Sequence, residues 1–127
     1  MKLLLLCLHG FEEYGFYEEA YKEPTLELIR SFAAAKKLIA SVCVGAFPVA
    51  KSGVLKGKKA TTYQLRGGYR RKQLEKFGVV LGEEWLQIDD GIITSSCPKT
   101  APEVAYQLLE MLTNKEKADE VRAGMGY

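Results

Sequence analysis

Cys43 is the residue whose neighbours point most directly to chemistry. It follows the apolar run from Leu38 to Val42 and precedes Val44 and Gly45, where a helix is expected to begin. A helix N-terminus offers unpaired N–H groups and a positive dipole, and both lower the pKa of a thiol. Gly45 would let the turn tighten and a ligand approach the backbone. The pattern is typical of the strand–nucleophile–helix elbow of hydrolases, with cysteine in place of serine. A buried structural cysteine has the same neighbours, so both interpretations stay open.

A histidine, a tyrosine and two more cysteines are the other candidates. His9 is the single histidine and ends the first apolar run, so it is either a base that activates the Cys43 thiol or a loop residue in contact with water. Tyr63 either donates a hydrogen bond to a substrate carbonyl or, as we expect, packs at the end of a strand. Cys7 is expected in the core. Cys97 is either a resolving thiol for an oxidised Cys43 or, as we expect, a loop residue remote from it.

The pattern of cysteines and charges excludes several classes of site. Three cysteines without regular spacing make neither a disulfide framework nor a zinc site, and reduced thiols indicate a cytoplasmic protein without a metal or other cofactor. The stretch "DDG" is expected to be a hairpin turn. "RGGYRRKQLEKFG" interleaves arginine with tyrosine and glycine, as RNA-binding segments do, but a solvated helix face explains it equally well. We expect no nucleic-acid partner.

Charge is distributed unevenly along a chain whose net charge is only +2. Residues 51–76 carry a net charge of +8, whereas residues 11–23 contain five acids and a single lysine. One face is therefore expected to be basic and one loop acidic.

Apolar periodicity predicts an alternation of strands and helices. The N-terminal run is too short to cross a bilayer and lacks a cleavage site, so we expect a buried strand and no membrane partner. Residues 11–21 lack a helical period and are expected to form a loop with at most a helical turn. We expect strands at residues 3–8, 38–42, 59–63, 79–81, 85–88 and 92–95, and helices at residues 24–36, 44–51, 69–77, 101–112 and 116–123. This order predicts one α/β domain over residues 1–127, with a mainly parallel sheet and helices on both faces.

Two long segments resemble a known family. "IASVCVGAFPVAKSGVLKGKKATTY" and "GIITSSCPKTAPEVAYQLLEMLTNKEKADEVRAGMGY" are similar to the ThiJ/PfpI (DJ-one/PfpI) family of the class I glutamine amidotransferase-like superfamily. The resemblance extends from about Gly10 to Tyr127. It implies a flavodoxin-like three-layer sandwich, usually homodimeric, with its reactive cysteine at Cys43. Activities of the family include glyoxalase and deglycase chemistry, peptidase or amidase activity, chaperone action and oxidative-stress sensing.

The N-terminal part departs from the family pattern. "MKLLLLCLHGFEE" resembles the family's first strand and acidic loop, yet "GFEEYGFYEEAYKEPTLELIRSF" continues as the segment after the family's "PGG" loop does. We infer a shortened or rearranged member that lacks some of the N-terminal strands.

The resemblance has consequences for individual residues. The family's glutamate that hydrogen-bonds the thiol falls on Gly15, so Glu12 or Glu13 would replace it only by a different path. If Gly10 takes the place of a glycine in the "PGG" loop, its amide and the Val44 amide would hold an oxyanion. Tyr63 stands where many members carry histidine, which excludes a Cys–His dyad at that position.

Three hypotheses follow. In the first, Cys43 is the nucleophile of an enzyme acting on small carbonyls, their protein adducts or amides, with a pKa below the usual value of about 8.5 and a partly exposed sulfur. In the second, the protein is a non-catalytic oxidative-stress sensor or is chaperone-like. In the third, the shortened chain has an uncovered sheet edge and no function of its own.

Overall fold

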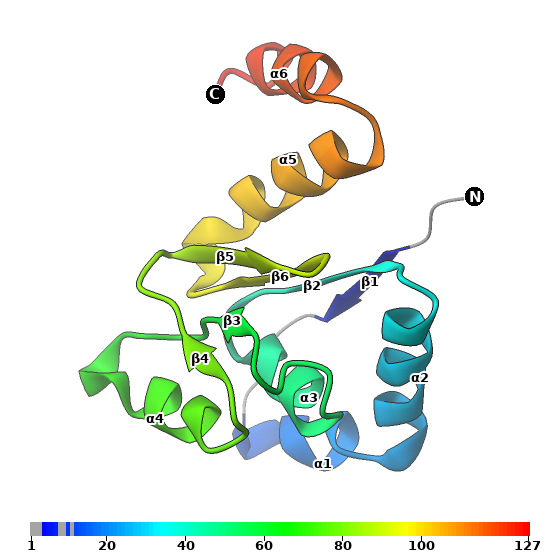
Figure 1. Ribbon diagram of the computed structural model, residues 1–127. Coiled ribbons are helices and arrows are strands. Elements are labelled where there is room, and N and C mark those ends of the chain that lie inside the picture. Colours follow the sequence, from blue (N-terminus) through cyan, green and yellow to red (C-terminus); the bar gives the residue numbers. More distant parts are fainter. Residues whose placement is uncertain (1–3, 8–9, 11) are drawn as a thin grey trace.

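A four-stranded sheet forms the centre of the protein (Figure 1). The computed structural model describes residues 4–7, 10 and 12–127. The strands are β1 (Leu4–Cys7), β2 (Leu38–Ser41), β6 (Ile92–Ser95) and β5 (Leu86–Asp89), side by side in the order β1-β2-β6-β5. β1, β2 and β6 run parallel, and β5 joins antiparallel to β6. The prediction of a mainly parallel sheet is confirmed.

Helices cover both faces of this sheet (Figure 1). α2 (Glu23–Ala34) and α3 (Ala46–Lys51) pack on one face, α5 (Ala101–Leu112) packs on the other, and α6 (Lys115–Gly124) lies against α5. α4 (Tyr69–Glu75) packs beside α3. Among the described residues, no helix is both long enough and apolar enough to span a membrane.

The ends of two elements follow from local chemistry. Pro24 lies in the first turn of α2, where its missing N–H has no partner to lose. Beyond α2, Lys36 adopts a left-handed φ of 57° while the Lys37 N–H donates to the Phe32 carbonyl, which closes the helix as in a Schellman motif. The hairpin between β5 and β6 turns through Asp90 and Gly91, at φ 50° and 74°, which confirms the turn predicted from "DDG".

Two segments differ from the expectation. The strand expected at residues 59–63 is only β3 (Lys59–Ala60), which pairs with β4 (Val80–Leu81) in a separate two-stranded sheet. It ends because the Thr61 N–H donates to the Thr94 hydroxyl instead of to a neighbouring strand.

The segment expected to be a loop contains a 3-10 turn at Glu12–Tyr14 and helix α1 (Phe16–Ala20). Its aromatic residues supply the packing that composition alone did not indicate, because the Tyr17 ring lies edge-on to Phe47 at 5.8 Å between centroids. The segment therefore packs on α3.

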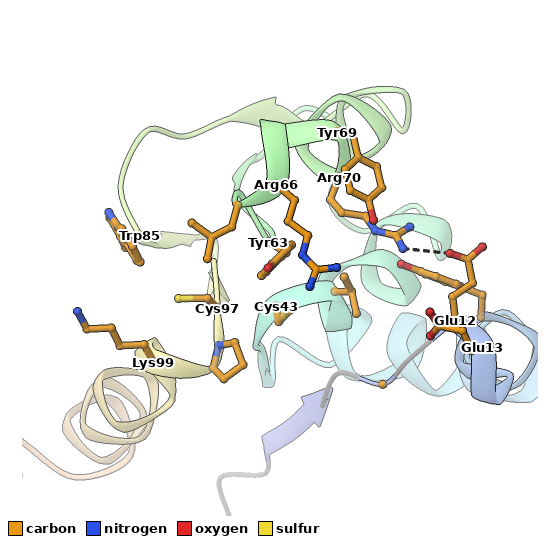
Figure 2. A pocket seen from close by; sticks show the side chains of 15 residues that line it. Glu12, Glu13, Cys43, Tyr63, Arg66, Tyr69, Arg70, Trp85, Cys97 and Lys99 are labelled. Carbon is orange, nitrogen blue, oxygen red and sulfur yellow. Dashed lines mark hydrogen bonds and ion pairs between the residues drawn. The ribbon is translucent and has the colours of Figure 1, made fainter.

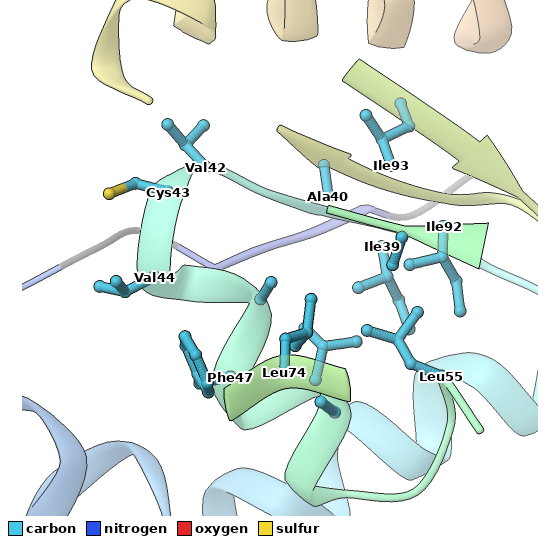
Figure 3. Packing of buried hydrophobic residues seen from close by; sticks show 14 of the residues in the cluster. Ile39, Ala40, Val42, Cys43, Val44, Phe47, Leu55, Leu74, Ile92 and Ile93 are labelled. Atoms are coloured by element: carbon cyan, nitrogen blue, oxygen red, sulfur yellow. The ribbon is translucent and has the colours of Figure 1, made fainter. Parts of the chain in front are cut away.

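The core extends over both faces of the sheet (Figure 3). Ile39 and Ile92 of the central strands are buried on the face that meets Phe47 of α3, whereas the buried Ala40 and Ile93 point to the opposite face. This packing fixes β2 and α3 relative to each other and so positions the turn between them, which carries Cys43.

Candidate functional site

The turn from β2 into α3 has the geometry of an elbow. Val42 is still extended, Cys43 adopts a left-handed φ of 58°, and the 3-10 turn Cys43–Gly45 leads directly into α3. A left-handed conformation costs a residue with a side chain about 1–2 kcal/mol. Backbone outliers of this kind cluster at functional sites.

Two hydrogen bonds hold the elbow in this conformation. The Gly45 N–H donates to the Val42 carbonyl at 3.0 Å. The Thr62 hydroxyl donates to the Cys43 carbonyl at 2.8 Å, and Thr62 is fully buried. The elbow is therefore pinned from the segment that follows β3.

Gly45 does not have the role expected for it. Its φ is −59°, an ordinary helical value, and its N–H is occupied by Val42. The unusual conformation of the turn resides in Cys43 itself, two residues earlier than predicted.

Cys43 lies on the wall of a cavity of about 580 Å³ (Figure 2). Its side chain is buried, with 7% exposed, so the partly exposed thiol expected from the sequence is wrong. Gly10, Val44 and Tyr63 line the same cavity, so the structure brings these predicted residues together. Tyr63 also packs against the core, as expected.

The pKa of the Cys43 thiol is raised, contrary to the expectation of an activated thiolate. Burial is the largest cause, because it disfavours the charged form, and the nearby Cys97 adds to it. The Val44 N–H, which donates to the sulfur, and the positive charge of Arg70 act in the opposite direction without outweighing burial. Desolvation at this elbow is therefore stronger than the favourable helix-end environment on which the prediction rested.

Gly10 is a glycine for a steric reason. A Cβ atom at this position would come within 2.7 Å of the Phe16 ring. A larger residue at this position would have to displace Phe16. Its amide, together with that of Val44, stays the predicted pair of oxyanion donors.

The predicted acid–base residues are only partly placed. His9 lies outside the described residues. Glu13 lines the cavity, whereas Glu12 is engaged by Arg70, with 3.1 Å between the carboxylate oxygen and Nη2. In Figure 2 both carboxylates lie at one end of the cavity and Cys43 lies near its middle. Among the described residues, no three His, Cys, Asp or Glu side chains are grouped to hold a metal ion.

Cys97 is part of the site, contrary to the expectation of a remote loop residue. It is buried, with 5% exposed, lines the same cavity as Cys43 and raises the pKa of that thiol. It reaches the cavity because β6 runs parallel beside β2, so both strands end at the same edge of the sheet. Both thiols are free.

Several cavity residues were missed by the sequence analysis. Arg66 and Arg70 belong to the basic stretch that was interpreted as a solvated face, yet both line the cavity, as does Trp85. The Arg70 guanidinium also lies over the Tyr17 ring, 5.3 Å from its centroid. Burial raises the pKa of Tyr17 to about 12. The interleaving of arginine with tyrosine in this stretch was the one signal in the sequence that indicated a binding role for these arginines. It did not indicate that they lie in the Cys43 cavity.

Comparison with known proteins agrees with the resemblance. The model of the DJ-1/PfpI family matches residues 15–111. DJ-1beta of Drosophila melanogaster is 34% identical over 99 residues, which cover 78% of this chain and 51% of that protein. The isonitrile hydratase of Pseudomonas putida is 46% identical over 59 residues, or 46% of this chain and 25% of the hydratase.

The fold agrees as well. The crystal structure of Drosophila DJ-1beta superimposes with a TM-score of 0.79 at 31% identity, over 96% of this chain and 62% of that one. The chain thus has the flavodoxin-like fold of these proteins while spanning about half of the length of the Drosophila sequence it matches.

Proposed function

The chain belongs to the DJ-1/PfpI family, and on that premise we propose that it is an enzyme with Cys43 as its nucleophile. Its substrates are small carbonyls, their protein adducts or amides, as in glyoxalase, deglycase, peptidase or amidase chemistry. The observation that carries the proposal is the left-handed elbow, which holds Cys43 on the wall of a cavity large enough for a substrate.

The first step follows from the geometry of the elbow. The Cys43 sulfur attacks the carbonyl carbon, an S–C bond forms, and the π electron pair moves to the carbonyl oxygen. The Val44 N–H, which donates to the sulfur in the free protein, is then free to donate to the new oxyanion, together with the Gly10 amide. With an aldehyde, the proton lost by the thiol ends on that oxygen. His9 and Glu13 are the proposed carriers of this proton.

Removal of the sulfur tests the proposal. With methylglyoxal as a representative α-oxoaldehyde, we expect Cys43→Ser to abolish turnover. Cys97→Ser is the matched control, because it removes a second buried thiol of the same cavity and leaves the sulfur of Cys43 in place. Equal turnover by Cys43→Ser and the parent protein would exclude Cys43 as the nucleophile.

One observation favours a second candidate, the non-catalytic oxidation sensor. Cys97 lines the same cavity as Cys43, where it is available as a resolving thiol. Hydrogen peroxide would oxidise the Cys43 thiol to a sulfenic acid, releasing water, and Cys97 would displace a second water to form a disulfide. The raised pKa of Cys43 slows its oxidation as it slows nucleophilic attack, because both reactions need the thiolate. The intact mass after peroxide treatment tests whether Cys97 resolves an oxidised Cys43. A disulfide lowers the mass by two hydrogens and supports the sensor, whereas a sulfinic acid adds two oxygens and contradicts it.

A further inference from the structure

The cavity around Cys43 is larger than a small aldehyde requires. Its volume of about 580 Å³ lies within the range of sites that enclose drug-sized ligands. Figure 2 shows Cys43 near the middle, Trp85 and Lys99 towards one end, and Glu12 and Glu13 towards the other. The substrate therefore has room for a group beyond the carbonyl that reacts.

The cations of this cavity divide into paired and unpaired ones. Arg70 is bound to Glu12, and its neighbour Arg71 to Glu83 at 3.3 Å. Arg66 and Lys99 line the cavity, and neither forms an ion pair or hydrogen bond with any residue of the described chain. Figure 2 shows the Arg66 guanidinium extending from the loop above the cavity towards the side where Cys43 lies.

The backbone that carries Arg66 is unusual as well. Arg66, Gly67 and Gly68 adopt left-handed φ values of 53°, 77° and 70° in succession. Glycine takes this conformation without penalty, but arginine does not. A strained residue that projects an unpaired guanidinium over a cavity is an arrangement found at ligand-binding sites.

We propose that Arg66 binds the carboxylate of the substrate, so that the site acts on carbonyl compounds that also carry a carboxylate. The planar guanidinium matches the two oxygens of a carboxylate, and its charge strengthens both hydrogen bonds. This inference rests on the proposed function of Cys43 for the reacting end of the substrate, and it adds the group that the protein recognises.

The acidic residues of the cavity do not cancel this preference. Glu12 is already paired with Arg70, and Glu13 lies beside it at one end of the cavity. A carboxylate bound at Arg66 would therefore meet an unpaired guanidinium while the carbonyl carbon of the substrate faces Cys43. The carbonyl then accepts the sulfur as described above, and the carboxylate takes no part in bond making.

Two alkylating agents of nearly equal shape test recognition at Cys43. Iodoacetate carries a carboxylate and iodoacetamide does not, and peptide mass spectrometry separates modification of Cys43 from that of the other cysteines. For both Cys43 and glutathione, the rate of alkylation by iodoacetate is divided by the rate of alkylation by iodoacetamide. We expect this ratio to be about tenfold higher for Cys43 than for glutathione, which is the effect of one hydrogen bond to a charged group. Arg66→Gln should abolish this rise, and Lys72→Ala, a charge loss on the exposed side of α4, should leave it intact.

A binding measurement keeps the two proposals separable. Trp85 is the single tryptophan and lines the cavity, so its fluorescence reports occupancy in a Cys43→Ala protein that cannot react. We expect lactate to change the fluorescence saturably, with lactamide binding about tenfold more weakly, and Arg66→Gln to remove the difference. Equal binding of lactate and lactamide, or of lactate to Arg66→Gln and parent, would overturn the carboxylate proposal. A Cys43 that reacts with neither alkylating agent, with lactate binding intact, would instead overturn the proposed nucleophile alone.

Discussion

At the scale of single residues, Cys43 is a thiol held between opposing influences. The Val44 N–H and Arg70 favour the thiolate, burial favours the thiol, and burial is the larger effect, so the pKa lies above its usual value. A nucleophile of this kind is mostly protonated at neutral pH. It is then active through its minor thiolate form.

The raised pKa predicts an alkaline reactivity profile. Below its pKa the thiolate fraction grows about tenfold per pH unit, so the rate of Cys43 alkylation by iodoacetamide should keep rising beyond about pH 8.5, where an unperturbed cysteine levels off. Quantitative peptide mass spectrometry across pH 6 to 11 measures this, with Cys43→Ala as the blank. A plateau reached below pH 8.5 would mean that the elbow does activate its thiol.

Tyr17 makes the second residue-scale prediction. Its hydroxyl is buried and has no hydrogen-bond partner among the described residues, and burial raises its pKa from 10.0 to about 12. Tyr17→Phe should therefore increase the free energy of unfolding by about 1 kcal/mol, since an unpaired buried polar group is removed. Urea titrations at pH 8 compare it with Tyr127→Phe, a change at an exposed ring that should have little effect.

The same pKa shift fixes the sign of the pH dependence. Between pH 10 and pH 12 the unfolded chain loses the Tyr17 proton while the folded chain keeps it, so stability falls as pH rises. Tyr17→Phe should lose less stability over this range than the parent protein. Equal slopes for the two would show that Tyr17 titrates normally in the folded state.

At the scale of elements, the junction of β2 and α3 concentrates backbone strain in Cys43, the residue proposed as the nucleophile. The strain predicts that Cys43→Gly is more stable than Cys43→Ala by about 1 kcal/mol, because glycine adopts the left-handed conformation without the Cβ penalty. Both variants lack the sulfur, so the comparison isolates the backbone. Equal urea midpoints for the two would show that the turn relaxes to an ordinary conformation.

The Thr62 hydroxyl provides a test of what pins this junction. Thr62→Val leaves the Cys43 carbonyl without its buried donor, so we expect a loss of about 1–3 kcal/mol in unfolding free energy. Thr62→Ser keeps the hydroxyl and should recover most of this loss. An altered pH profile of Cys43 alkylation in Thr62→Val, restored in Thr62→Ser, would separate a positioning role from a purely structural one.

At the scale of the whole molecule, the sheet has edges at β1 and β5. Unpaired strand edges invite pairing with another chain. We propose that residues 1–127 form one α/β domain that assembles as a homodimer or a higher oligomer in the cytoplasm, which agrees with the resemblance to the family. Sedimentation equilibrium should then give at least twice the chain mass of 14.2 kDa. Urea denaturation should show a single cooperative unfolding transition. A monomer at high concentration would contradict the assembly, and two separate transitions would contradict the single domain.

Local sequence patterns were sufficient for much of the architecture. The helix predicted at residues 101–112 coincides with α5, and the "DDG" turn adopts the conformation that its residues favour. Hydrophobic periodicity and turn preferences act over a few neighbouring residues, which is why they can be recognised without a structure. The same local logic placed Cys43 between a strand and a helix.

The sequence by itself determined the order of the longer elements, the elbow position and the family to which the chain belongs. Only the tertiary structure decided that Cys97, Arg66 and Arg70 share a cavity with Cys43, and that burial raises the pKa of its thiol. The physical reason is that solvation and charge at a point depend on every segment that reaches it. Here those segments come from residues 12–17, 43–44, 63–70 and 85–99, which no pattern of neighbouring residues brings together.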